Sequence, residues 1–211
     1  MPEVSSFDFA RLAALKQYAD LENHLVRILR YALAGDQLAA DTVFFQIVST
    51  SVRYHIITNL LREREEGVYS RAWKWIEKRV GDCDRARNEL VHWSERTIPT
   101  ITLSQEGENF SVSNIDLIPE LRNPKSNANA SPIIREADIW EKRDQMRVML
   151  HIINRFGLTL NDNANWPWQT LFRQPITFDE PAEFLKCLNE AGHPAELPPY
   201  QKKILPLYKS K

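Results

Sequence analysis

Residues 85–92 contain the side chains of this sequence that are best suited to chemistry. His92, Asn88, Arg85 and Arg87 all lie within this short stretch. A histidine titrates near neutral pH and can take or give a proton. Guanidinium groups match the geometry of phosphate oxygens and can stabilise negative charge that grows in a transition state, and an amide can orient a phosphate. This combination favours a site that cleaves phosphodiester bonds.

These side chains share one face if residues 85–92 are helical. Asn88 and His92 are four residues apart and therefore lie on one side, with Arg85 on nearly the same line. Glu89 lies one turn before His92. Arg87 lies on the flank, but its long side chain can reach the same side. The opposite face is apolar, and we expect it to anchor the helix to a core through Cys83, Ala86, Leu90 and Trp93.

No metal ion or other cofactor is predicted for this site. His92 has no histidine or cysteine partner at helical spacing, and Glu89 alone is not enough to hold a metal. His24, His55 and His151 occur on three different predicted helices. A single histidine on an amphipathic helix is more often a boundary residue than a metal ligand.

The charge of the chain limits how it could bind a nucleic acid. The 211 residues carry a formal net charge of −1, with 43% hydrophobic and 26% charged residues. Affinity for phosphate would therefore depend on a local patch of cations. Two stretches could supply it: residues 71–87, with Lys74, Lys78, Arg79 and Arg85 beside Glu77, Asp82 and Asp84, and the tail, with Lys202, Lys203, Lys209 and Lys211. The alternative interpretation is that these charges only solvate a helix face.

The elements that position these residues are mainly helical. Apolar residues at three- and four-residue steps predict long helices from Ser5 or Ser6 to Gly35, and from Asp41 to Gly67. Further helices are expected over 70–80 and, after a break or kink at Gly81-Asp82, on to residue 94. Two more are expected over 138–157 and over 181–191. Alternation over 98–104 and 109–115 suggests a β-hairpin. We therefore expect a bundle over 1–160 with an insertion at 98–131, and a Pro- and aromatic-rich extension over 161–211 that docks on the bundle or on a partner subunit.

The motif resembles that of the HEPN superfamily, in which Arg is followed after four to six residues by His, often with Asn directly after the Arg. Arg87, Asn88 and His92 match it in order and spacing, and Arg85 satisfies the longest allowed gap. The resemblance covers about residues 6–97 and 135–160. It implies an antiparallel bundle of four to five helices that forms a homodimer, with two motifs facing a shared cleft.

The resemblance also implies an activity. Many members are metal-independent endoribonucleases of toxin–antitoxin or antiphage defence systems, so it implies an RNA substrate and an antitoxin or other partner protein. His92 would be the acid/base, Arg87 the charge stabiliser and Asn88 the positioning group. Arg85 would be an auxiliary. From their place on or before the motif, we also predict Arg85, Glu89, Lys78 and Arg79 as binding residues.

Other interpretations stay open at this point. The chain could be a non-catalytic HEPN-like interaction or nucleotide-binding protein, or a small-molecule sensor. His92 could simply offset the negative end of the helix dipole, with a local hydrogen bond to Asn88. The sequence has no apolar run long enough to cross a bilayer and no export signal, and Cys83 and Cys187 are far apart, so we expect no membrane association and a cytoplasmic location.

Overall fold

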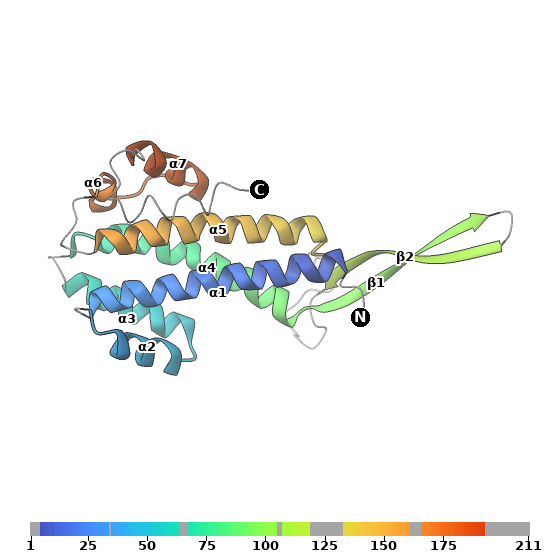
Figure 1. Ribbon diagram of the computed structural model, residues 1–211, viewed down its shortest axis with the longest axis horizontal. Helices are drawn as coiled ribbons and strands as arrows, with labels where there is room; N and C mark the ends of the chain where they lie inside the picture. The colour runs from blue at the N-terminus through green and yellow to red at the C-terminus, as the bar shows by residue number, and fades with distance from the viewer. Residues whose placement is uncertain are drawn as a thin grey trace. The chain divides into compact units, whose positions relative to one another are not determined.

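The chain is mainly helical, as predicted, in the computed structural model, which describes residues 5–33, 35–63, 67–104, 107–118, 133–160 and 166–192 (Figure 1). The helices in these residues are α1 (Ser6–Ala32), α2 (Gln37–Gln46), α3 (Thr50–Glu63), α4 (Ser70–His92), α5 (Glu136–Thr159), α6 (Gln169–Arg173) and α7 (Pro181–Ala191). The strands are β1 (Ser94–Ser104) and β2 (Gly107–Ile118). None of these helices combines the length and the apolar character that a membrane crossing requires.

Two compact units make up the chain. The first consists of Met1–Leu21 and Val80–Arg147, and the second of Glu22–Arg79 and Val148–Lys211. Helices α1, α4 and α5 each contribute one part of their length to each unit. The first unit also contains β1, β2 and residues 85–92, so it is the unit that positions the candidate site.

The core of the first unit joins the three long helices to β2. Its buried residues are Phe7, Ala10 and Ala14 of α1, Leu90 of α4, Leu117 of β2, Ile134, and Ile139 of α5. β1 and β2 are antiparallel, from the pair Ser94 and Ile118 to the pair Ser104 and Gly107. Two backbone hydrogen bonds then join Leu117 to Ile134, just before α5. The burial of Leu90 fixes the last turns of α4 against this core.

The second unit has an aromatic core. Trp73 of α4 is fully buried, stacks on Phe156 of α5 at 6.2 Å between ring centroids, and meets Tyr54 of α3 edge to face. Phe156 also packs edge to face against Phe172 of α6, which contacts Phe184 of α7. The Pro- and aromatic-rich residues after α5 thus supply large apolar side chains to this core, where aromatic burial is a major source of stability.

The predicted break at Gly81-Asp82 is wrong, because α4 runs without interruption from Ser70 to His92. Val80, Cys83 and Ala86 are buried on both sides of Gly81. The apolar stripe therefore stays in phase, and its burial outweighs the roughly 1 kcal/mol that glycine costs within a helix.

The single helix predicted from Asp41 to Gly67 is also wrong. Asp36, not Asp41, caps α2 by accepting a hydrogen bond from the Ala39 amide at 2.9 Å, and α2 ends at Gln46. Ile47 is extended, and its carbonyl accepts a hydrogen bond from the Arg53 guanidinium at 2.6 Å, so a side chain of α3 satisfies the end of α2. The helix predicted over 181–191 is confirmed by α7.

Burial also predicts how the two cysteines react. Desolvation of the Cys83 thiol, with smaller contributions from Asp84 and Asp82, raises its pKa from 9.0 to about 12. Only the thiolate is nucleophilic. We therefore expect iodoacetamide at pH 8 to modify half-buried Cys187 in the folded chain and to leave Cys83 unmodified, as measured by peptide mass spectrometry.

The same shift affects stability at high pH. Folding favours the protonated Cys83 thiol, so its contribution to the free energy of unfolding is lost as the pH rises from 9.0 towards about 12. Below pH 9.0 the thiol is largely protonated in both states and this dependence vanishes. In the iodoacetamide experiment, denaturant should make both cysteines react equally. Equal modification of Cys83 and Cys187 in the folded chain would contradict the protection of Cys83 by burial.

Candidate active site

Three of the predicted site residues form an exposed stripe along the end of α4. Arg85, Asn88 and His92 are exposed, and His92 is the last residue of the helix. The opposite side of the helix is anchored, since Cys83, Ala86 and Leu90 are buried. We call Arg85, Asn88 and His92 the α4 stripe.

Arg87 approaches this stripe from the flank. Its side chain is half-buried, and its Nη1 donates a hydrogen bond to the Asn88 Oδ1 at 3.0 Å. The bond draws the guanidinium from its own side of the helix towards Asn88, which lies one turn before His92. Arg87 and Asn88 are therefore in contact, and His92 follows on the same exposed face as Asn88.

A second contact holds α4 just before the motif. The Tyr18 hydroxyl of α1 donates a hydrogen bond to the Oδ1 of Asp84, which is buried. Asp84 lies one helical turn before Asn88. The helix segment that carries the stripe is thus tied to α1 as well as packed on the apolar core.

The cations around the stripe differ in their partners. Arg85 pairs with Asp82 on the same helix, and Glu89 pairs with Lys142 of α5 at 2.8 Å. Arg87 is different, because within the described part of the chain it has no carboxylate partner and its hydrogen bond goes to a neutral amide. Arg85 and Lys142 are therefore each neutralised by an acid, whereas Arg87 has no acid beside it among the described residues.

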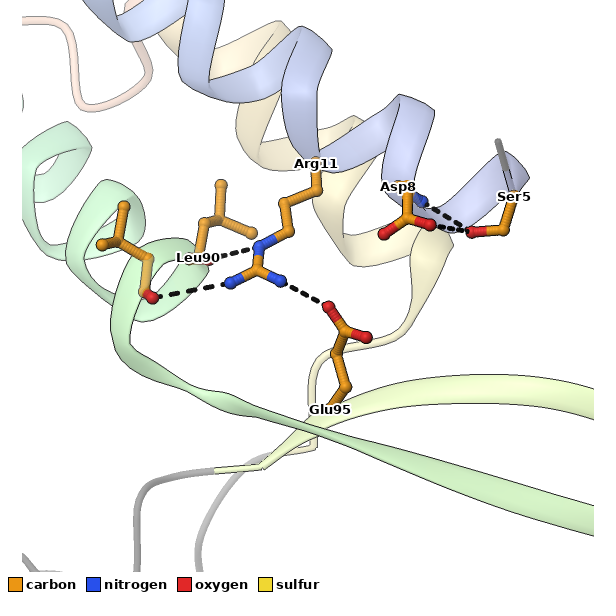
Figure 2. Close-up of polar contacts among 6 residues, drawn as sticks. Ser5, Asp8, Arg11, Leu90 and Glu95 are labelled. Atoms are coloured by element: carbon orange, nitrogen blue, oxygen red, sulfur yellow. Dashed lines mark hydrogen bonds and ion pairs between the residues drawn. The ribbon is translucent and has the colours of Figure 1, made fainter. Parts of the chain in front are cut away.

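The carbonyl end of α4 is capped by Arg11 of α1 (Figure 2). The Arg11 Nε donates to the Leu90 carbonyl at 2.6 Å and its Nη2 to the Val91 carbonyl at 3.5 Å. Its Nη1 also pairs with Glu95, at the start of β1, at 2.5 Å. One guanidinium thus satisfies carbonyls that a helix end leaves without intrahelical partners, and joins the helix to the strand that follows.

This cap bears on the role of His92. A guanidinium at the C-terminus of a helix also offsets the negative end of its dipole. Because Arg11 already occupies that position, the helix does not depend on His92 for it. The His92 imidazole is exposed at the same helix end.

Removal of the cap should destabilise the fold. In Arg11→Met, two carbonyls and the Glu95 carboxylate lose a charged donor. We expect the free energy of unfolding in urea to fall by about 1–3 kcal/mol, the usual range for such partly buried, charge-assisted bonds. Arg27→Met, an exposed substitution on the same helix, should change it by less than about 0.5 kcal/mol. Equal effects of the two substitutions would contradict the capping role.

Two of the predicted binding residues lie in the second unit. Lys78 is exposed there, and Arg79 donates to the Asp179 carbonyl at 2.8 Å while its guanidinium lies over the Trp75 ring. Arg79 is thus engaged by the segment before α7. Within the described ranges, no three histidine, cysteine or acidic side chains gather as metal ligands would.

Arg11 and Lys142 were missed by sequence reasoning. Both come from helices remote in sequence from the motif, and nothing in their local sequence distinguishes them from other surface cations of amphipathic helices. Only the pairing of α1 and α5 with α4 brings them to it.

Comparisons of the chain with protein-family models, with curated proteins and with solved structures find no match. The site therefore has to be interpreted from its own chemistry and from the motif.

Proposed function

We propose that this chain is a HEPN-like, metal-independent endoribonuclease whose site is built from Arg87, Asn88 and His92. The proposal depends chiefly on Arg87, whose guanidinium is not paired with an acid in the part of the chain that the structure describes. Its guanidinium contacts Asn88 beside the exposed stripe and has no carboxylate partner among the described residues. A cation in this state is available to a phosphate, whereas Arg85 and Lys142 already hold acids.

The groups suit cleavage by the ribose of the RNA itself. His92 takes the proton of a 2′-hydroxyl as the 2′-oxygen attacks the adjacent phosphorus, and the bond to the 5′-oxygen breaks. The leaving 5′-oxygen gains a proton from an acid or from water. Arg87 stabilises the charge that develops on the phosphate oxygens, and Asn88 orients the phosphate. The products are a 2′,3′-cyclic phosphate and a 5′-hydroxyl.

A homodimer would complete such a site. The α4 stripe lies on the exposed face of one helix, and one copy supplies a single His92. When two copies face each other through their stripes, the second imidazole serves as the acid that protonates the leaving oxygen. The resemblance to HEPN proteins supports this arrangement, and it also supports a role as a toxin or a defence component with an antitoxin partner.

Cleavage in the presence of EDTA tests the proposal. We expect the purified chain to cut single-stranded RNA into fragments with 2′,3′-cyclic phosphate and 5′-hydroxyl ends. The same sequence with 2′-O-methyl groups should stay intact, because it lacks the attacking hydroxyl. Intact RNA at all protein concentrations, or equal cleavage of both substrates, would contradict the proposal.

A second candidate function is a non-catalytic HEPN-like protein that binds nucleotides or a partner. The pairing of Arg85 with Asp82 and of Lys142 with Glu89 favours it, because these two cations beside the motif hold acids before any polyanion arrives. RNA that is bound but not cut by the unmodified chain would favour this function over the nuclease.

A further inference from the structure

Lys142 lies beside the proposed site on a different helix. Its Nζ is 2.8 Å from the Oε2 of Glu89, which directly follows Asn88 in α4. The Lys142 side chain is 24% exposed and that of Glu89 is 30% exposed. Both side chains are therefore partly open to solvent, and Lys142 contacts α4 at Glu89, one residue after Asn88 and one turn before His92.

An incoming anion can replace the Glu89 carboxylate as the partner of the Lys142 ammonium group. Pairs that keep this much contact with water contribute little to stability, because water screens their attraction. A phosphate brings a full negative charge and several acceptor oxygens to the same ammonium. Lysine reaches such groups as a flexible point charge, so the side chain can leave Glu89 without movement of either helix backbone.

We propose that Lys142 is a binding residue for the phosphate backbone of RNA, and that Glu89 is its internal competitor, which occupies it until RNA displaces the carboxylate. This inference rests on the proposed function, since it takes the α4 stripe as the place where RNA binds. It assigns a role to Glu89 that is distinct from catalysis: Glu89 lowers the affinity of the free site for polyanions and so limits non-specific binding.

A double-mutant cycle of Lys142→Met and Glu89→Gln, with RNA affinity as the measured quantity, tests this competition. The protein carries His92→Ala so that RNA stays intact, and the probe is a fluorescent single-stranded RNA of mixed sequence. Lys142→Met should weaken binding by roughly threefold to tenfold at low salt and lower the slope of log affinity against log salt by about 0.7, the value for one phosphate contact on a single strand. Lys142→Arg should retain most of the affinity.

Glu89→Gln distinguishes direct competition from a general charge effect. It should strengthen binding by about threefold or more, but only while Lys142 is present, because its effect acts through the freed ammonium. Glu141→Gln removes an exposed acid of the same unit and should change affinity much less. Lys16→Met, an exposed substitution on α1, is the control for Lys142→Met. Circular dichroism of each variant verifies folding.

The inference is overturned if Lys142→Met binds as tightly as its parent. It is also overturned if Glu89→Gln strengthens binding equally with and without Lys142→Met, or if no RNA binds at low salt. Cleavage by the unmodified chain in EDTA is read separately. If RNA is cleaved but Lys142→Met has no effect, the proposed nuclease stands and the role of Lys142 falls. If binding depends on Lys142 but RNA is not cleaved, the role of Lys142 stands and the nuclease falls.

Discussion

His92→Ala is expected to slow RNA cleavage by about 10²- to 10⁴-fold, the range that general acid–base catalysis contributes. Alanine can neither take the proton of the 2′-hydroxyl nor return one. The rate is measured as single-turnover cleavage of a labelled RNA in EDTA. His55→Ala is the matched control, because His55 is also an exposed helical histidine but lies on α3 in the second unit. It should cleave at the rate of the unmodified chain.

Stability separates this catalytic role from a structural one. His92 is exposed and Arg11 already caps the carbonyl end of α4, so His92→Ala should change the free energy of unfolding by less than about 0.5 kcal/mol. A variant that loses stability but keeps its cleavage rate would assign His92 to the helix dipole. That outcome would remove His92 from the proposed catalytic site, although the chain would still cleave RNA.

Trp73→Ala is expected to have the largest effect on stability, a loss of about 3–5 kcal/mol in the free energy of unfolding. Trp73 is fully buried, stacks on Phe156 and contacts Tyr54 edge to face. Its indole Nε1 also donates a hydrogen bond to the Thr58 Oγ1 at 2.8 Å. The substitution therefore opens a cavity and removes a hydrogen bond at once.

Two further substitutions control for this effect. Trp73→Phe keeps an aromatic ring in the stack but removes the indole donor, so its loss should be smaller than that of Trp73→Ala. Val48→Ala truncates a side chain that is 91% exposed and should cost less than about 0.5 kcal/mol. Urea unfolding followed by circular dichroism measures all three. A loss for Trp73→Ala no larger than that for Val48→Ala would show that this aromatic cluster does not stabilise the second unit.

The helical class could be predicted from the sequence because it is a local property. The apolar steps of α1 and the proline at the start of α7 are local signals that favour helices. The errors occur where tertiary contacts decide. Gly81 is tolerated because its neighbours are buried, and the Arg53 guanidinium satisfies the Ile47 carbonyl where α2 ends.

The candidate site could be predicted only in part for the same reason. Helical spacing places Asn88 and His92 on one exposed side, with Leu90 buried behind them. Spacing says nothing about which cations are neutralised or which helix end is capped. The pairing of Glu89 with Lys142 and the cap from Arg11 depend on how α5 and α1 lie against α4, so they emerge only from the folded unit.

The most direct test of the central claim is the cleavage rate of Arg87→Ala, of His92→Ala and of the variant that carries both. Loss of a phosphate-stabilising donor alone should cost about 10²- to 10³-fold. If Arg87 and His92 act in one step on the same phosphodiester, the double variant should be about as slow as the slower single variant. A double variant whose loss is the full product of the two single losses, or an Arg87→Ala chain that cleaves normally, would contradict a shared site.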